Sequence, residues 1–207
     1  MVKNRIFVVV KTSEDRIATQ FLKDLIDVEC SYRLSDDVMW RFIGLMKREE
    51  VKKGCSVIEE GRVNPDIYVV AEGIFSYNYL NGTDERCCAF ALPGTMMWSA
   101  YSYYAGEPAV YSYQACCDSV VYHCPMRDFD ELIRTSHDFA RWMLCYTQCQ
   151  LYFFEKKNTL INGDAFERLQ ALWRNRPEIL DKVSKKSIAS YLGITQQYLS
   201  VLLKKLG

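Results

Sequence analysis

The chain has 207 residues, of which 49% are hydrophobic and 25% are charged, a composition typical of a folded soluble protein. Basic and acidic residues number 26 each, and no stretch approaches eighteen uncharged apolar residues, so a transmembrane helix is excluded. Nine cysteines occur without a CxxC pair or a signal peptide, which predicts reduced thiols in the cytoplasm and excludes zinc-ribbon and thioredoxin motifs.

The zero net charge hides an asymmetry along the chain. Residues 164–207 carry eight Lys and Arg against four Asp and Glu, a local charge of +4. The rest of the chain must therefore carry −4. This separation predicts an anionic partner for the C-terminal part.

Residues 12–50 have a helical pattern. The first apolar group at helical spacing is Phe21, Leu22, Leu25 and Ile26. Ser35, Asp36 and Asp37 then provide a cap for a second helix, whose apolar residues are Val38, Phe42, Ile43, Leu45 and Met46.

From about Glu50 to Cys124 the apolar period changes to two, and glycine-containing turns follow at short intervals. Phe75, Tyr77 and Tyr79 alternate with polar residues, and Asn81-Gly82 offers the positive φ angles of a two-residue hairpin turn. Short, evenly spaced strands of this kind predict a small antiparallel barrel or roll.

Helical periodicity returns after Pro125 and predicts one long helix over residues 126–161. Five apolar residues are spaced 3, 4, 3 and 4 apart, as in two heptads of a coiled-coil seam. They are Phe139, Trp142, Tyr146, Cys149 and Phe153. We predict that this helix pairs with a second copy of itself in a homodimer.

Asn162-Gly163 breaks the long helix, and Asp164 is placed to cap the next one. The predicted fold class is therefore α+β, in three parts. Residues 1–125 form N-terminal helices and a β-roll, 126–163 a dimerisation helix and hinge, and 164–207 a helical domain.

The C-terminal residues predict two short helices joined by a tight turn. Ser184 is placed to cap the first, Gly193 supplies the turn, and Thr195 caps the second. This is the layout of a helix-turn-helix, whose second helix enters the DNA major groove. The alternative is an ordinary helical hairpin in a core, and the basic charge of the segment favours DNA.

From about Leu34 to Lys205 the chain resembles the Crp/Fnr family of bacterial transcription regulators, in the form common in Bacteroidetes. The glycine-punctuated motifs Lys53-Gly54, Glu60-Gly61, Asp66–Val70 and Glu72-Gly73 are similar to the β-roll of cyclic nucleotide-binding domains. Asp164–Leu169 resembles the family's helix-restart segment, and Ile188–Thr195 its helix-turn-helix. The resemblance implies a homodimer that reads a palindromic site on double-stranded DNA.

The sequence departs from the family where cyclic nucleotides bind. The resemblance implies a Gly-Glu pair and an Arg-Ser or Arg-Thr pair around the phosphate, because a helix N-terminus and a guanidinium neutralise its charge. Here Trp98-Ser99 and Ala109-Val110 stand at those places, and residues 87–126 contain no arginine. Cyclic AMP binding is therefore not expected, unless a rearranged phosphate site exists.

Aromatic residues replace the expected charged ones. One interpretation is a pocket for an apolar or aromatic effector, oriented by tyrosine hydroxyls. The other is that these side chains fill the former cavity. The candidate pocket residues are Trp98, Ser99, Tyr101, Val110, Tyr111 and Tyr113.

The second C-terminal helix also departs from the family, since Val201 stands where arginine is frequent. Glutamine reads adenine, and lysine binds phosphate without reading sequence. The predicted DNA-binding residues are Lys185, Lys186, Thr195, Gln196, Gln197, Ser200, Lys204 and Lys205. The alternative is an effector-sensing or protein-interaction dimer in which DNA binding has degenerated.

No catalytic, metal or cofactor site is predicted. The sequence has only two histidines, no Gly-rich phosphate loop and no GxSxG motif, so we do not expect an enzyme. Only Cys30 precedes the roll, which argues against the iron–sulfur cluster of Fnr-type members. Cys145 and Cys149 lie four apart and fit either a metal or redox pair across a dimer or buried thiols.

Overall fold

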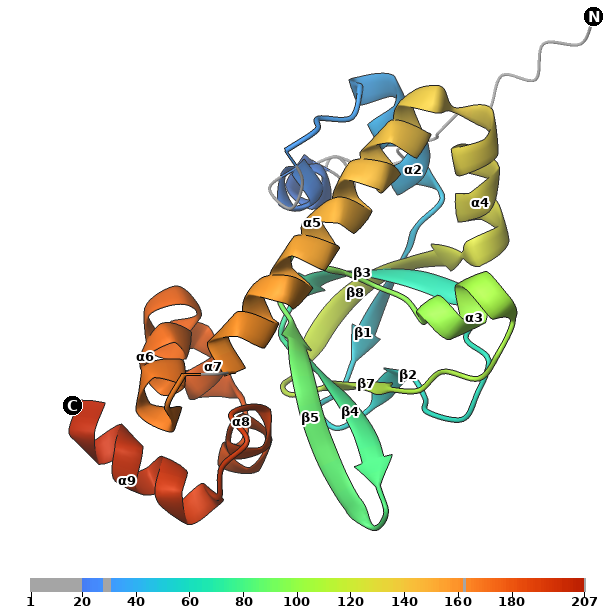
Figure 1. Cartoon of the computed structure of the whole chain (residues 1–207). Helices are drawn as coiled ribbons and strands as arrows, with labels where there is room; N and C mark the ends of the chain where they lie inside the picture. Colours follow the sequence, from blue (N-terminus) through green and yellow to red (C-terminus); the bar gives the residue numbers. More distant parts are fainter. Residues whose placement is uncertain (1–19, 28–30, 162, 207) are drawn as a thin grey trace, which may run out of the picture.

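The computed structural model describes residues 20–27, 31–161 and 163–206 (Figure 1). The strands are β1 (Lys47–Val51), β2 (Ser56–Ile58), β3 (Asp66–Glu72), β4 (Phe75–Asn81), β5 (Asp84–Ala91), β6 (Met96–Met97), β7 (Ser112–Ala115) and β8 (Ser119–Pro125). The helices are α2 (Asp36–Gly44), α3 (Ala100–Ala105), α4 (Met126–Thr135), α5 (His137–Ile161), α6 (Ala165–Asn175), α7 (Pro177–Lys182), α8 (Lys185–Tyr191) and α9 (Gln196–Leu206). Residues 20–27 are also helical.

The predicted antiparallel roll is confirmed. One sheet has the order β1-β8-β3-β6 and the other β2-β7-β4-β5, with every pair antiparallel. Both sheets contribute to one apolar cluster, made of Val51, Ile58, Tyr68, Val70, Phe75, Ala91, Met97, Ala109, Tyr113, Ala115 and Val121. The alternating pattern therefore arises because one face of each strand points into this core.

The hairpin turn lies one residue later than predicted. Asn81 pairs with Asp84 as the last residue of β4, so the two-residue loop is Gly82-Thr83. Gly82 has φ +66°, whereas Asn81 does not take a positive φ. A glycine at the first central position is the pattern of a type II′ turn, which matches the strand twist.

The helix predicted over residues 126–161 is two helices. Ser136 takes an extended conformation (φ −126°, ψ 108°) and separates α4 from α5. Its hydroxyl accepts a hydrogen bond from the backbone N–H of Phe139 at 3.2 Å, so it caps the start of α5. In a sequence, a serine that caps a helix looks the same as a serine on the polar face of a continuous helix. The pattern therefore does not predict the break between α4 and α5.

A second core joins the helices to the outside of the roll. Phe42 of α2 lies 5.2 Å from Phe139 and 5.8 Å from Trp142, measured between ring centroids. Leu22 and Ile26 of the N-terminal helix belong to the same cluster. The two helices predicted within residues 12–50 are therefore confirmed where the structure describes them, except that α2 ends at Gly44, so Leu45 and Met46 lie beyond it and residues 47–50 belong to β1. Residues 12–19 and 28–30 lie outside the described residues.

The C-terminal helices α6 to α9 form a third cluster. Asp164 caps α6 as predicted, and its carboxylate accepts from the backbone N–H groups of Phe166 and Glu167 at 2.8 Å. Ile74 of the roll is buried in the same cluster as Leu169 and Leu199. Of the predicted hinge pair, Asn162 lies outside the described residues. Among the helices of the described residues, none combines the length and the apolar character that a membrane span requires.

Candidate functional site

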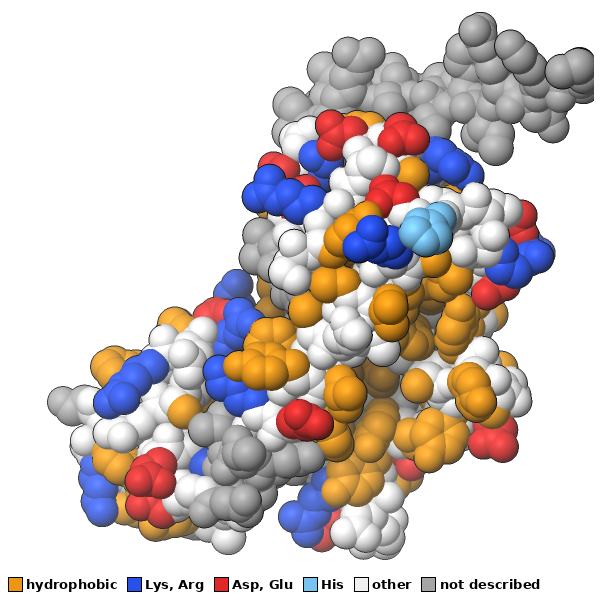
Figure 2. Space-filling model, turned by 45° about the horizontal axis from the view of Figure 1, so that its top comes forward, with side chains coloured by type: hydrophobic (Ala, Val, Ile, Leu, Met, Phe, Trp, Pro, Cys, Tyr) orange, Lys and Arg blue, Asp and Glu red, His pale blue; other side chains and the backbone are white. Residues whose placement is uncertain are grey.

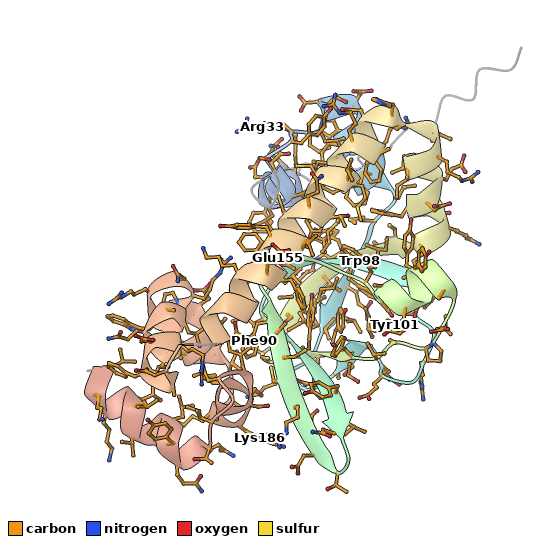
Figure 3. All side chains as sticks on the ribbon, viewed as in Figure 1. Arg33, Phe90, Trp98, Tyr101, Glu155 and Lys186 are labelled. Carbon is orange, nitrogen blue, oxygen red and sulfur yellow. The ribbon has the colours of Figure 1, made fainter. Side chains whose placement is uncertain are left out.

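A cavity of about 250 Å³ lies in the roll, between β4, β6, α3, β7 and α5. The structure brings all six predicted pocket residues to its lining. They are Trp98, Ser99, Tyr101, Val110, Tyr111 and Tyr113, joined by Tyr77, Met96, Ala100, Ala109 and Gln150. Figure 3 shows Trp98 beside α5 and Tyr101 on α3, and hydrophobic side chains gather on the face of the roll seen in Figure 2.

A stacked pair of tyrosines forms one wall. The rings of Tyr77 and Tyr113 lie 4.0 Å apart at an interplanar angle of 9°. The Tyr113 hydroxyl donates to the carbonyl oxygen of Trp98 at 2.9 Å, and burial raises the pKa of this phenol above its ordinary value. Tyr113 is thus a neutral side chain whose proton is already engaged, so it is a wall residue rather than a donor to a ligand.

Ser99 holds the start of α3 in place. Its hydroxyl oxygen accepts from the backbone N–H of Ser102 at 3.1 Å. The Ser102 hydroxyl in turn donates to the carbonyl oxygen of Glu107 and accepts from the N–H of Asn64. These contacts give Ser99 a capping role at the start of α3.

Sequence reasoning missed Gln150, which reaches the cavity from α5. Its position follows from Tyr146, one turn earlier, whose hydroxyl accepts from the N–H of Met96 in the roll at 2.9 Å. Residues four apart share a helix face, so Gln150 faces the roll as well. The helical period places these two residues together, but only the tertiary structure shows that this face meets the cavity.

The cavity lining carries no charged side chain among the described residues that form it. Ala109 and Val110 lie in the lining, where the family resemblance implies an Arg-Ser or Arg-Thr pair. The polar side-chain groups of the lining residues are the tyrosine and serine hydroxyls, the indole N–H of Trp98 and the carboxamide of Gln150. Such a lining suits a neutral ligand, since a desolvated phosphate requires a compensating cation.

The turn between α8 and α9 has the predicted geometry. The Ser184 hydroxyl accepts from the N–H of Ser187 at 3.1 Å, and Thr195 Oγ1 accepts from the N–H of Tyr198 at 3.2 Å. Gly193 has φ +67°, a conformation that favours glycine. The buried Ala189 belongs to the core of the pair.

The predicted DNA-binding residues lie on the surface of this helix pair. Lys185, Lys186, Thr195, Gln196, Gln197, Lys204 and Lys205 are exposed, and Ser200 is half-buried. The Ser200 hydroxyl donates to the carbonyl oxygen of Gln196 at 3.0 Å. Lys186 Nζ lies 3.9 Å from a carboxylate oxygen of Glu85 in the β4–β5 hairpin.

Tyr198 also lies on the exposed face of α9, and sequence reasoning did not select it. Its side chain is 46% exposed and that of Val201 is 50% exposed. Both residues share a helix face with Lys205, at spacings of three and four. This spacing was the signal that could have identified Tyr198.

Three of the five residues predicted for the dimer seam are instead buried inside the chain. Phe139, Trp142 and Tyr146 are at most 1% exposed and belong to the core with α2 and α4. Cys149 is half-buried and Phe153 is exposed. Apolar residues spaced three and four apart indicate a helix face that packs against another element. That element can belong to the same chain or to a second copy, and the spacing is the same in both cases.

In the described part of the chain, no group of three or more His, Cys, Asp and Glu lies close enough to hold a metal ion. His123 Nδ1 lies 3.1 Å from an Asp66 oxygen, and its ring stacks on Tyr68 at 5.5 Å. The Cys145 sulfur lies 3.4 Å from the Ser31 hydroxyl.

Comparisons with known proteins identify the fold. Residues 48–136 match the family model "Cyclic nucleotide-binding domain". Among solved structures, the chain is similar to FixK2 from Bradyrhizobium japonicum (TM-score 0.66, 21% identity, covering 78% of this chain and 84% of that one). It is similar to the c-di-GMP responsive global regulator CLP of Xanthomonas campestris (TM-score 0.65, 17% identity, 83% and 91%).

A putative cAMP-binding regulatory protein from Silicibacter pomeroyi is similar as well (TM-score 0.65, 18% identity, 90% of this chain and 88% of that one). No curated protein sequence matches this chain. At these identities the solved structures show the fold alone. The chain therefore has the antiparallel cyclic nucleotide-binding fold, extended by helices into an α+β molecule.

Proposed function

We propose that this chain is a DNA-binding transcription regulator of the Crp/Fnr type, acting in the cytoplasm. The observation that carries the proposal is the capped α8–α9 pair, with an exposed polar and basic face, which follows a roll of the cyclic nucleotide-binding fold. Two helices joined by a tight turn present the second helix to a major groove. The local charge of +4 in residues 164–207 adds phosphate attraction.

In the proposed complex, α9 reads the base edges. Gln196 and Gln197 lie exposed at its N-terminal end and suit adenine, while Val201 suits the methyl group of thymine. Lys204 and Lys205 contact phosphate at the other end. This set favours an A·T-rich half-site.

We further propose a homodimer through the exposed apolar residues of α5. The exposed large apolar side chains of this helix are Leu144, Leu151, Tyr152, Phe153 and Phe154. Isolated apolar residues on a surface are ordinary, but Leu144, Leu151 and Phe154 recur at spacings of seven and three on a helix that runs between the roll and α6, so they share one face that can receive a second copy (Figure 1). A two-fold dimer implies palindromic half-sites about one helical turn apart.

The cavity in the roll is the proposed effector site. Its uncharged, aromatic lining supports a neutral apolar or aromatic ligand in place of a cyclic nucleotide. We therefore propose that the phosphate site of the fold is lost in this chain.

The test is selection from a randomised duplex pool at low and moderate salt, followed by sequencing of the retained DNA. We expect an enriched, A·T-rich palindrome. In the Lys204→Gln/Lys205→Gln variant, the slope of log K against log salt should fall by about 0.9 for each phosphate that a lysine no longer neutralises. The matched control is Lys47→Gln, an exposed lysine on β1, which should leave the slope unchanged. Failure of the protein to retain any duplex at either salt concentration would contradict the proposal.

A second candidate function is a sensor that acts through a protein partner without DNA. The exposed apolar residues Tyr198 and Val201 on α9 favour it, because DNA-reading helices are usually polar. Failure to retain any duplex at either salt concentration would support this candidate, whereas retention without enrichment, lost as salt rises, would indicate phosphate attraction only.

A further inference from the structure

The edge strand β5 is covered by α8 within the same chain. The strand order β2-β7-β4-β5 leaves β5 at the edge of its sheet. The backbone N–H of Cys87 on this edge donates to the Ser190 hydroxyl of α8 at 2.8 Å. The α8 hydroxyl thus accepts a hydrogen bond from a backbone N–H of the edge strand. Such an N–H has no partner strand and would otherwise bind water.

Apolar and charged contacts extend this interface on both sides. The rings of Phe90 on β5 and Tyr191 on α8 lie 5.1 Å apart, and Lys186 approaches Glu85 at 3.9 Å. Ile74, at the turn into β4, is 1% exposed and is buried among the C-terminal helices. Phe90 and Lys186 mark this junction in Figure 3. The helix pair that presents α9 is therefore docked on the hairpin.

The same hairpin forms a wall of the cavity. Tyr77 of β4 lines the cavity and stacks on Tyr113. The pairing register shifts at this residue, because Tyr77 pairs with Ala89 while Asn78 pairs with Cys87. Cys88 is thus the extra residue of a β-bulge, and its thiol donates to the carbonyl oxygen of Tyr77 at 3.4 Å.

The bulge residue Cys88 at the cavity wall is therefore the direct neighbour of Cys87, whose N–H makes the hydrogen bond to α8. A ligand that displaces the Tyr77 ring moves β4 at the residue where its pairing register with β5 shifts. Bulges bend and twist a strand locally, so a change there reorients the neighbouring Cys87 N–H. The Ser190 hydrogen bond and the Phe90–Tyr191 ring contact then pass the change to α8.

We propose that the β4–β5 hairpin transmits occupancy of the cavity to α8, and through α8 to α9. The proposal rests on the effector cavity proposed above. The two coupled sites are the cavity wall at Tyr77 and the surface of α9 that faces DNA in the proposed complex. The β4–β5 hairpin, which is docked on α8, connects them. Tyr77 and Ser190 are positioning residues in this scheme.

The experiment is amide hydrogen exchange on the full-length protein, with neither ligand nor DNA. Tyr77→Ala removes the stacked wall, and we expect exchange in α8 to become about fivefold faster or more, the lower end of ordinary coupling between sites. The matched control is Tyr104→Ala on α3, since Tyr104 is 93% exposed and does not line the cavity. The control should leave α8 unchanged.

A double-mutant cycle tests the route. In a Ser190→Ala background, Tyr77→Ala should accelerate exchange in α8 less than it does in the wild type, because one of the two connecting contacts is already absent and only the Phe90–Tyr191 ring contact remains. Should Tyr77→Ala lose its folded state, Tyr77→Leu, which keeps an apolar side chain in the strand, takes its place.

Two outcomes would overturn the inference. One is exchange in α8 within about twofold of wild type after the Tyr77 change, well below ordinary coupling. The other is acceleration of α4 and α5 as large as that of α8, which would mean general destabilisation. The exchange readout uses no DNA, so failure of DNA selection alone would count against the proposed function and not against this coupling.

Discussion

A single carboxylate connects the start of α5 to the segment before α2. Asp138 accepts from the Tyr32 hydroxyl at 2.6 Å, from the backbone N–H of Ser35 at 3.0 Å and from the Ser35 hydroxyl. These hydrogen bonds, that of the Ser35 hydroxyl first, hold the pKa of Asp138 below its ordinary value of 3.8. The sequence pattern predicts Ser35 only as a helix cap, but its side chain makes no capping hydrogen bond and makes this longer-range contact instead.

Asp138→Asn should lower the free energy of unfolding at pH 7 by about 1 kcal/mol, because a carboxamide presents one acceptor where two oxygens accept now. A pKa that is lower in the folded state contributes stability above the unfolded-state value and loses it as pH falls through the folded-state value. The difference between wild type and variant should therefore shrink below about pH 4. Urea unfolding at several pH values measures it, with exposed Asp181→Asn as control; a constant difference would contradict the argument.

Gly73 is a position where only glycine fits. Its φ is +91°, and an added Cβ would lie 2.0 Å from the Ser119 hydroxyl oxygen. Gly73→Ala should lower stability by the strain of the left-handed backbone, about 1 to 2 kcal/mol, plus a similar cost of overpacking. Gly54→Ala is the matched control, since Gly54 has φ +86° and no atom within 4 Å of an added Cβ. Equal losses in the two variants, measured by thermal unfolding, would contradict the close approach.

Among the elements, α5 has two roles along its length. Its first half carries Phe139, Trp142 and Tyr146 into the core of the chain, and its second half exposes Leu151 to Phe154. The heptad-like spacing continues across both halves. The change of role therefore depends on where the roll, α2 and α4 end along the helix, which periodicity alone does not contain.

The two halves of α5 predict opposite results for substitutions. Leu151→Glu and Phe154→Glu should leave the thermal unfolding midpoint of the protomer nearly unchanged and shift the mass from dimer to monomer, since charge at an apolar interface is unfavourable. Trp142→Ala should lower the stability of the protomer by about 3 to 5 kcal/mol. Light scattering after size-exclusion chromatography and urea unfolding measure the two effects. A dimer that survives both glutamate changes would contradict the proposed interface.

At the scale of the whole molecule, the fold and the lining of its cavity differ in what they suggest about ligands. The match of residues 48–136 is to a cyclic nucleotide-binding domain, whereas the cavity lining has no cation among its described residues. Because a fold carries many functions, the lining decides the ligand chemistry.

Cyclic AMP should therefore leave the thermal unfolding midpoint unchanged. A ligand that binds the native state at 100 times its dissociation constant stabilises it by about 2.7 kcal/mol, a shift that is easily measured. The measurement is the thermal unfolding midpoint with and without cyclic AMP or cyclic GMP. It is made on the wild type and on Ala109→Arg, a variant that adds a cation to the cavity lining. A rise in the unfolding midpoint of the wild type with either nucleotide would support a rearranged phosphate site in the cavity.

Local patterns were enough to predict the order and type of most elements. Alternation and turn residues predicted the roll, and Asp164, Ser184 and Thr195 marked helix starts where the structure has them. The six pocket residues were predicted together because they occupy one short stretch, residues 98–113, which a resemblance to the cyclic nucleotide-binding roll already placed at the ligand site. Gln150 was missed because it reaches the cavity from a helix far along the chain.

The sequence by itself determined an antiparallel roll with a capped helix pair after it, because strand alternation, turns and caps are local effects of neighbouring residues. The tertiary structure alone decided which face of α5 is core, that the α8 hydroxyl of Ser190 caps the β5 edge, and that Gln150 joins the cavity. These are contacts between segments tens of residues apart, and the same apolar or polar side chain satisfies many such partners. Packing selects one of them, and no local pattern records that selection.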